Sequence, residues 1–547
     1  MKTQTKSIGW TVLAVVVLWI TASAAYYRFG PFARHQEPSV ASNSQPSAVT
    51  PHQIKEYCAL CHAYPPPDSF PRSAWKEEVE KAYKLIAQAQ LDPRGRRVPP
   101  PPPMEQVIRY YEEQAPVELP LATITQDSSP CPVQFQQIHY PVPPQGPEPA
   151  ISNVNLVHLF DDRRLDVLAC DMRVGRVMAL RPYVSAPTWQ ILGSVPNPCH
   201  TEVVDLDGDG VKDILVAGLG SMEPQDHSRG TVIWLRGQRD GGFTAIPLLK
   251  GVGRVADVQA ADFRGIGRLD LVVAEFGWFQ TGRILYLENQ TTDWSHPAFV
   301  PRELDERHGG IHVPVADLDG DGRPDFVALL SQEHETIVAF LNRGGGKFRK
   351  ETIYAAPHPG YGSSGIQLVD LNGDGRPDVL FSNGDTMDPP YLLKPFHGIQ
   401  WLENQGKFPF LHHPIAPMYG VHRALAADFR GNGKFDIVAV SYLPPDRFPQ
   451  RKQLNLDAVI YLEQTSSGQF ARHSLETITC DHATCAVGDI FGTGRLDLVT
   501  GDFLYRASDR AITIWKNLGP DKAQPSPSRS AGVPSAGSAS GTPASRK

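Results

Sequence analysis

Residues 317–329 read DLDGDGRPDFVAL, an Asp-rich turn that runs directly into an apolar strand. Six clear copies of this marker occur, and they start at Asp205, Asp262, Asp317, Asp370, Asp428 and Asp489. The starts are 57, 55, 53, 58 and 61 residues apart, and a degenerate seventh copy, HLFDDRRLDVLAC, begins at His158. A nearly constant period of this length indicates a repeat architecture.

Each marker is followed by a second apolar strand, such as TVIWLRGQ, and then by a turn and an outer strand, such as GGFTAIPLL. Four short strands per repeat, with no helical period, predict the blades of a β-propeller. Residues 131–518 accommodate seven blades, and the chain is therefore expected to be mostly β. The last blade lacks an outer strand, so we predict that VQFQQIHYP, residues 133–141, pairs with it and closes the ring.

Three of the Asp-rich turns carry a complete set of oxygen ligands in a tight, Gly-containing loop, a pattern typical of Ca²⁺ sites. The candidate ligands are Asp205, Asp207, Asp209 and Asp213; Asp317, Asp319, Asp321 and Asp325; and Asp370, Asn372, Asp374 and Asp378. Other copies place Arg264, Ile266, Arg430, Asn432, Phe491 and Thr493 at the middle positions and are expected to hold no ion. There the guanidinium of Arg264 or Arg430 is expected to pair with the flanking carboxylates. The competing interpretation of the complete loops is a turn with solvated Asp side chains.

A second motif precedes the repeats: Cys58-Ala59-Leu60-Cys61-His62. Two thiols at this spacing form thioethers with haem, and the adjacent histidine supplies the proximal iron ligand. A disulfide or a zinc site is the competing interpretation. Residues 51–121 also contain two helical patterns and predict a small α-helical domain. Met104 is the candidate distal ligand, with His52 and an open sixth position as the alternatives.

The N-terminal residues 1–27 place Lys2 and Lys6 before an uncharged stretch long enough to span a bilayer. They are expected to be a membrane anchor, with a cleavable signal peptide as the alternative because residues 22–24 read Ala-Ser-Ala. Both interpretations place the rest of the chain in the cell envelope, on the periplasmic side of the membrane. Residues 28–50 are expected to be a flexible linker and residues 519–547 a disordered tail.

The 547 residues carry a formal charge of −7 from 52 basic and 59 acidic residues. No long basic run occurs, which argues against nucleic acid as a partner. Five cysteines remain outside the haem motif. Cys480 with Cys485, and Cys170 with Cys199, are possible disulfide pairs that would leave Cys131 alone; buried reduced thiols are the alternative.

Four histidines lie five to seven residues before a marker Asp, on the expected innermost strands of four blades: His200, His312, His422 and His482. Imidazoles that converge at the central tunnel are able to bind a transition metal or relay protons. The alternative is a set of unrelated, hydrated side chains.

Residues 131–518 resemble an FG-GAP or VCBS repeat propeller, as found in integrin α chains and many bacterial envelope proteins. Residues 51–121 resemble a monohaem cytochrome c. The resemblances imply about three Ca²⁺ ions and one covalent haem, but the propeller class serves adhesion, ligand binding and scaffolding, so it implies no reaction.

The leading hypothesis is an anchored or exported cytochrome that performs single-electron transfer, with the propeller as a docking platform for a redox partner protein. This function requires no catalysis by side chains. One alternative is a haem-linked propeller oxidoreductase that acts on a small molecule, although the sequence shows no Gly-rich dinucleotide loop. The other is an adhesion or scaffolding module that carries the haem domain as a passenger.

Overall fold

The computed structural model describes residues 49–60, 62–89, 99–143, 148–504 and 510–520. The predicted anchor at residues 1–27, nearly all of the linker and the tail beyond residue 520 lie outside this part of the chain. Among the described residues, no helix is both long and apolar enough to cross a membrane.

The first described part is helical, as predicted. It contains α2 (Pro51–Cys58), α3 (Trp75–Ala89), α4 (Met104–Gln114) and two short 3-10 turns, Pro67–Ser69 and Arg72–Ala74. Helix α2 begins with a capping box, in which the Thr50 side chain accepts from the backbone of Gln53 and the Gln53 side chain accepts from that of Thr50. Helices α3 and α4 pack through Trp75 and Tyr111, whose buried rings stack with centroids 3.9 Å apart.

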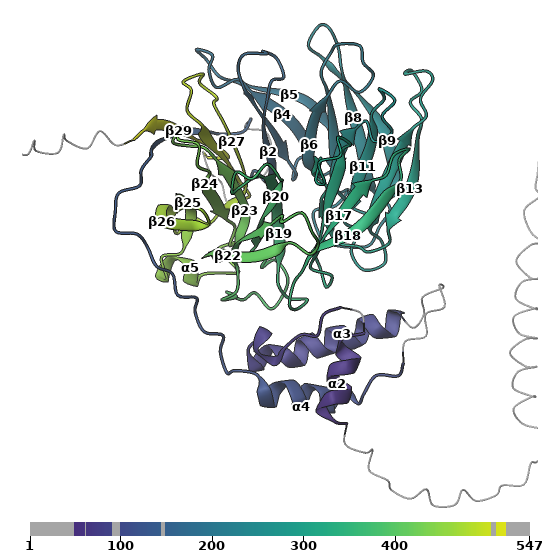
Figure 1. Cartoon of the computed structure of the whole chain (residues 1–547), viewed down its shortest axis with the longest axis vertical. Helices are drawn as coiled ribbons and strands as arrows, with labels where there is room; N and C mark the ends of the chain where they lie inside the picture. The colour runs from purple at the N-terminus through teal and green to yellow at the C-terminus, as the bar shows by residue number, and fades with distance from the viewer. Residues whose placement is uncertain (1–48, 61, 90–98, 144–147, 505–509, 521–547) are drawn as a thin grey trace, which may run out of the picture. The chain divides into compact units, whose positions relative to one another are not determined.

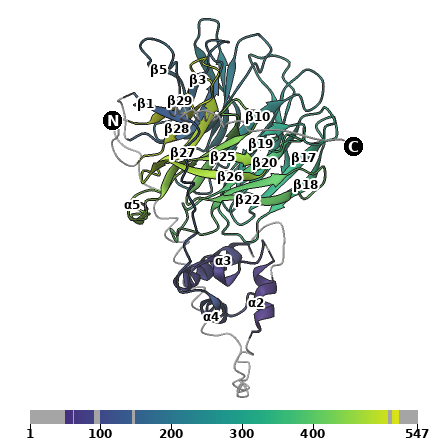
Figure 2. The ribbon, with the colours of Figure 1, turned by 60° about the vertical axis from the view of Figure 1, so that its left-hand side comes forward.

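Seven antiparallel sheets form the rest of the described chain, and Figures 1 and 2 show them arranged around a common axis. The predicted seven-bladed propeller is therefore confirmed. Blade 1 holds β2 (Ile151–Val157), β3 (Asp166–Asp171), β4 (Arg176–Leu180) and β5 (Trp189–Ser194). Blade 2 holds β6 (Pro198–Val204), β7 (Asp213–Gly218), β8 (Gly230–Gly237) and β9 (Phe243–Val252). Blade 3 holds β10 (Val255–Ala261), β11 (Asp270–Glu275), β12 (Arg283–Asn289) and β13 (Phe299–Asp305).

Blade 4 has a divided inner strand and holds β14 (Gly310–His312), β15 (Val315–Ala316), β16 (Asp325–Leu330), β17 (Thr336–Asn342) and β18 (Phe348–Ala355). Blade 5 holds β19 (Ser363–Val369), β20 (Asp378–Asn383), β21 (Gly398–Glu403) and β22 (Leu411–Pro417). Blade 6 holds β23 (Val421–Ala427), β24 (Asp436–Ser441), β25 (Asp457–Ser466) and β26 (Gln469–Thr477), with a short helix, α5 (Gln450–Gln453), before β25. Blade 7 holds β27 (His482–Gly488), β28 (Asp497–Asp502) and β29 (Ile512–Gly519).

The ring closes as the sequence predicts. Strand β1 (Gln134–Tyr140) precedes the first blade but pairs antiparallel with β29, the third strand of the last blade. Ile138 lies opposite Ile514, and the sheet order is β1-β29-β28-β27. The pairing removes the open edge that β29 would otherwise present.

The core lies between neighbouring blades. Every residue of each second strand is buried, because both faces of these strands pack against adjacent sheets. One cluster joins Val327 and Leu329 of blade 4 to Val379 and Phe381 of blade 5. Near-continuous apolar runs after each marker follow from this burial on two faces.

Asparagine side chains at the end of several third strands connect successive blades. Asn342 Nδ2 of blade 4 donates to the Phe263 carbonyl of blade 3 at 2.9 Å. Asn404 of blade 5 reaches the Leu318 carbonyl, and Asn517 reaches that of Phe429. The Asn at the end of the third strand therefore links blades in blades 4, 5 and 7, whereas Asn289 of blade 3 donates within its own blade, to the Leu269 carbonyl.

The six described cysteines are free thiols. Cys480 contacts the carbonyls of Leu456 and Asp457, whereas Cys485 belongs to a different buried cluster. The Cys480–Cys485 and Cys170–Cys199 disulfides considered from the sequence are not formed, and the alternative of buried reduced thiols describes the structure.

Candidate functional site

The Asp-rich loops share one position in every blade, between the first and second strands. Because the strands of each sheet are antiparallel, these loops all lie on one face of the propeller, and the loops after the second and fourth strands lie on the other. We call these the Asp-loop face and the opposite face.

Two of the three complete loops bring three carboxylates together. Oxygens of Asp205, Asp207 and Asp213 lie within 4.8 Å of one another, and the corresponding Asp317, Asp319 and Asp325 do the same. Asp213 is buried, and burial raises the pKa of its carboxyl group. A divalent cation would offset the charge of such a set, so the residues fit Ca²⁺.

The third predicted side chain of each loop turns away from this set. Asp209 Oδ1 accepts from the backbone N–H of Val211 at 2.8 Å, and Asp321 pairs with Arg323. In the loop that begins at Asp370, Asp374 pairs with Arg376 at 2.5 Å. The structure therefore assembles three, not four, of the predicted ligands in each of the first two loops.

The incomplete loops of blades 3 and 6 contain an arginine at the position that Asp207 has in blade 2. Arg264 donates to both oxygens of Asp270, at 2.9 and 2.8 Å, and Arg430 donates to both oxygens of Asp436, at 2.8 Å each. This is the pairing predicted from the sequence. Asp270 occupies the position that Asp213 has in blade 2, and an internal guanidinium compensates its charge.

The haem motif lies at the end of α2. Cys58 is the last residue of that helix and is half-buried; Cys61 lies outside the described residues. The Nδ1 atom of His62 lies 2.8 Å from the carbonyl oxygen of Ala63, which leaves Nε2 for a metal. Histidines that bind metals commonly use their second nitrogen in this way, so His62 fits an axial ligand, and covalent attachment of haem stays a prediction.

Met104, the predicted distal ligand, is the first residue of α4 and is half-buried. Ligation of iron by Met104 stays a prediction. His52 lies in α2, with its ring 3.2 Å from Glu56 and largely exposed.

Several contacts connect the helical part to the propeller. Lys81 of α3 donates to the carbonyl of Pro389, and Lys394 lies over the Phe70 ring at 5.8 Å. Both propeller residues belong to the loop between β20 and β21, which lies on the opposite face. The chain after α4 then follows blade 6, where Asp127 N–H donates to the Arg472 carbonyl at 2.9 Å.

The four candidate histidines do not occupy equivalent positions. Each innermost strand contacts the innermost strand of the next blade around the ring, and each contains a register shift near its start. The residue just after that shift lies five positions before the marker in every blade. These seven residues are Asn153, His200, Asp257, His312, Gly365, Arg423 and Thr484.

His200 and His312 are members of this axial ring, and Asp257 lies between them. His200 Nε2 is 3.1 Å from one Asp257 oxygen, and His312 Nδ1 is 3.7 Å from the other. Arg423 reaches from blade 6 to within 3.2 Å of His312 Nε2. Because arginine only donates, this Nε2 is an acceptor and the Nδ1 proton faces Asp257.

The charges in the axial ring are compensated. Burial lowers the pKa of both His200 and His312 below the ordinary range of an imidazole. Burial alone would raise the pKa of Asp257, but His200 and His312 hold it below its usual range. The ring thus contains one carboxylate and one guanidinium on opposite sides of His312.

The other two histidines lie elsewhere. His422 is one residue before the ring position, packs edge-on against Tyr442, and has its pKa lowered to about 4 by burial. His482 is two residues before it and contacts Asp502 at 2.6 Å. The prediction that all four imidazoles converge is therefore wrong. Asp257 and Arg423 were not predicted, although each lies five positions before a marker, as His200 and His312 do.

Two stretches of the propeller, residues 205–273 and 317–381, match the FG-GAP-like repeat. The chain contains FG-GAP-like repeats. It is 22% identical over 265 residues to human cartilage acidic protein 1, a match that covers 45% of this chain and 38% of that protein. The chain thus spans well under two thirds of this relative.

Among solved structures, the chain is similar to BBS1N in two crystal structures of its complex with ARL6DN, one soaked with lead and one with mercury. The sequence identity is 11% in both. The TM-scores are 0.44 and 0.43, and the matches cover 72% and 71% of this chain and 98% of each matched chain.

Proposed function

We propose that this protein is a c-type cytochrome of the cell envelope that transfers single electrons, and that its propeller is the docking platform for a redox partner protein. The observation that carries the proposal is the haem motif at the end of α2, with His62 held through Nδ1 and its Nε2 left for iron. A haem bound there would supply one-electron chemistry. The propeller side chains need only position the partner.

The attachment of the helical part to the propeller supports a joint role. Lys81 and Phe70 of the helical part contact the propeller, and so does Asp127 in the segment that follows it. An independent passenger domain would need none of these contacts. A partner that docks on the opposite face of the propeller would thus approach the haem as well.

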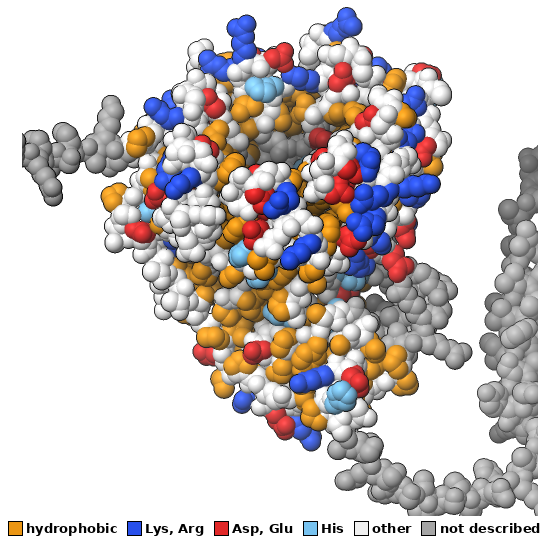
Figure 3. Space-filling model, in the orientation of Figure 1, with side chains coloured by type: hydrophobic (Ala, Val, Ile, Leu, Met, Phe, Trp, Pro, Cys, Tyr) orange, Lys and Arg blue, Asp and Glu red, His pale blue; other side chains and the backbone are white. Residues whose placement is uncertain are grey.

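The surface is compatible with docking of a protein. Leu60, between the two motif cysteines, is 54% exposed, and Figure 3 shows hydrophobic side chains gathered over the helical part of the molecule. Over the propeller, basic and acidic side chains are interspersed. An exposed apolar side chain next to the haem attachment point is suited to a short-lived protein contact.

Ca²⁺ has a structural role in this proposal. The ions would bind on the Asp-loop face, whereas the helical part contacts the opposite face. They would fasten the turn between the first two strands of a blade, without contact to the haem.

The test is an absorption spectrum of the purified chain, oxidised and reduced, combined with a haem assay after denaturation. We expect one covalent haem per chain and sharp α and β bands on reduction. Cys58→Ser/Cys61→Ser should abolish covalent attachment, because both thioether bonds are lost, whereas the matched control Cys131→Ser, at a half-buried cysteine outside the motif, should keep it. Absence of haem from protein produced with a working haem-attachment system would refute the proposal.

The distal ligand is tested separately. If Met104 binds the iron, the oxidised protein shows an absorption band near 695 nm, and Met104→Ala removes it while Met387→Ala does not. A high-spin spectrum that is the same in all three proteins would refute Met104 as the ligand and would favour ligand binding at the haem.

A further inference from the structure

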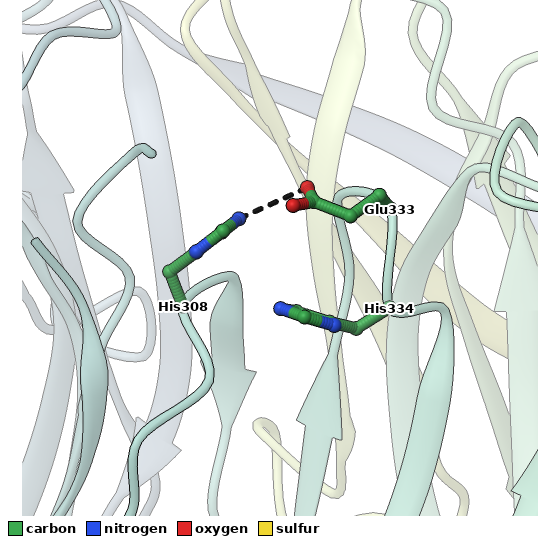
Figure 4. Close-up of side chains that lie close together, drawn as sticks. All are labelled: His308, Glu333 and His334. Carbon is green, nitrogen blue, oxygen red and sulfur yellow. Dashed lines mark hydrogen bonds and ion pairs between the residues drawn. The ribbon is translucent and has the colours of Figure 1, made fainter. Parts of the chain in front are cut away.

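Three side chains that play no part in the proposed electron transfer converge on the opposite face of the propeller. His308 lies in the connection between β13 and β14, and Glu333 and His334 lie in the turn between β16 and β17. Their ligand atoms lie within 4.8 Å of one another. Figure 4 shows the two imidazoles and the carboxylate directed towards a common space from two separate loops.

The individual contacts define this space. His308 Nε2 lies 2.9 Å from Glu333 Oε2, and the two imidazole rings have centroids 4.8 Å apart. The His308 side chain is 14% exposed and that of Glu333 28%. The cluster is thus largely enclosed, yet open to solvent on one side.

Backbone contacts fix the two loops relative to each other. Gly309, next to His308, donates its N–H to the Phe276 carbonyl, and its own carbonyl accepts from the Ser331 N–H, both at 2.8 Å. Gln332 and Glu335, on either side of the Glu333-His334 pair, have φ angles of 56° and 40°. Residues other than glycine rarely adopt this left-handed backbone conformation unless the surrounding structure imposes it. Such residues cluster at functional sites.

The far end of the turn is also anchored. The buried Glu335 carboxylate accepts from the backbone N–H of Gly362 at 3.1 Å and from that of Ser363 at 2.9 Å. The turn that presents Glu333 and His334 is thus fastened to the next blade.

We propose that His308, Glu333 and His334 form a binding site for Zn²⁺. Two imidazoles and one carboxylate are a ligand set that zinc accepts, with a fourth position left for water or another small ligand. Imidazole nitrogen selects against Ca²⁺, which takes oxygen ligands, so this site differs in kind from the Asp-rich loops. The ion replaces the hydrogen bond between His308 and Glu333.

A hydrogen-bonded pair of His308 and Glu333 without a metal is the competing explanation. It accounts for two of the three residues but gives no reason for His334, whose ring lies beside His308. A metal requires all three. The proposal is independent of the haem, because the cluster contains no residue of the haem motif.

The test is equilibrium dialysis of the tag-free full chain against micromolar Zn²⁺ in millimolar Ca²⁺, followed by metal analysis. Excess Ca²⁺ saturates the oxygen-ligand loops, so that bound zinc reports nitrogen-containing sites. We expect His308→Ala and His334→Ala each to lose one equivalent of zinc. His296→Ala is the matched control, because His296 is exposed and lies 3.2 Å from a carboxylate, Asp293, but belongs to no three-ligand cluster among the described residues. This variant should bind zinc as the unaltered protein does.

Two further measurements make the result decisive. X-ray absorption at the zinc edge of the unaltered protein should show two imidazoles and one carboxylate; a shell of oxygens alone, or of sulfur, would overturn the proposal without reliance on any variant. A Cys58→Ala/Cys61→Ala variant, which has no haem-attachment thiols, should still bind the one equivalent of zinc that depends on His308 and His334. Zinc binding that persists in both histidine variants, or no binding by the unaltered protein, would also overturn it.

Discussion

Arg264 donates hydrogen bonds to both carboxylate oxygens of Asp270, at 2.9 and 2.8 Å, in the loop where blade 2 has Asp207 and Asp213. The buried carboxylate at the end of the loop is common to both blades. In blade 3 the guanidinium of Arg264 pairs with this carboxylate itself. In blade 2 Arg236 pairs with Asp207, at 2.5 Å, and Asp213 accepts from the backbone N–H groups of Leu206 and Gly237. The loop of blade 2 therefore holds more carboxylate than guanidinium charge, which suits a divalent cation.

This difference predicts that calcium stabilises the loops of blades 2 and 4 but not the loop of blade 3. Chelation should lower the melting temperature of the unaltered protein, because an ion that binds only the folded state contributes about 2.7 kcal/mol at 100 times its Kd. Asp319→Ala should reduce the calcium-dependent part of the melting temperature. Differential scanning calorimetry with millimolar Ca²⁺ and with excess chelator measures both effects.

Arg264→Ala is the comparison for that experiment. It leaves the buried Asp270 charge without its partner, which typically costs about 3–5 kcal/mol, and the loss should be the same with and without calcium. If chelation changes the melting temperature of neither the unaltered protein nor Asp319→Ala, the complete loops are turns with solvated carboxylates.

The period of the Asp-rich turns was sufficient to predict the blade number and the closing strand. Each copy joins an Asp- and Gly-rich turn to an apolar strand, so the copies could be counted as blades. The last blade lacks an outer strand, and residues 133–141, before the first blade, match the pattern of that strand. The axial ring was harder to predict from residue type. His422 and His482 are the same residue type as His200 and His312 and lie only one or two positions further from their marker Asp. Because each inner strand has a register shift at this point, a difference of one position changes which groups the side chain faces.

The link made by Asn342 was not predicted, because its function depends on two blades at once. Its side chain donates to the Phe263 carbonyl of the preceding blade at 2.9 Å, and it is fully buried. Asn342→Ala removes this donor and leaves a buried carbonyl unsatisfied, which should cost about 1–3 kcal/mol. Asn432→Ala, at an exposed loop position, should change the stability by less than about 0.5 kcal/mol in the same denaturant titration. Equal effects of the two substitutions would show that the link between blades contributes nothing.

His482 predicts a specific dependence of stability on pH. Burial alone would lower its pKa, but the carboxylates of Asp502 and Glu476 raise it to about 10, above the ordinary value of 6.5. The folded state therefore holds this proton more tightly than the unfolded state. The resulting stabilisation is complete below about pH 6.5 and is lost as the pH rises through 10, with a slope of at most about 1.4 kcal/mol per pH unit.

The measurement is the melting temperature of the unaltered protein and of His482→Gln between pH 6 and 9.5. The difference between the two proteins should shrink as the pH rises. His422→Gln is the control: burial lowers the pKa of His422 to about 4, so above about pH 7.5 this imidazole is neutral in both the folded and the unfolded state, and the substitution should give a pH-independent difference there. A constant difference for His482→Gln would mean that the imidazole is neutral when buried beside Asp502.

The closing strand predicts where the chain can be shortened. Residues 134–140 complete blade 7 through pairing with β29, and Ile138 packs against the core between blades 7 and 1. A chain that begins at residue 119 keeps this strand and the segment along blade 6, and it should fold to a propeller with the β-sheet circular dichroism of the full chain. A chain that begins at residue 142 exposes the edge of β29, and it should aggregate or unfold at a lower temperature because an unpaired edge strand templates association. Gln136→Pro/Gln137→Pro in the full chain tests the same pairing without truncation. Successive N–H groups of a strand point to opposite sides, so one of these two faces β29 and proline removes it as a donor. Full stability of both the shorter chain and the proline variant would show that the ring does not depend on β1 for closure.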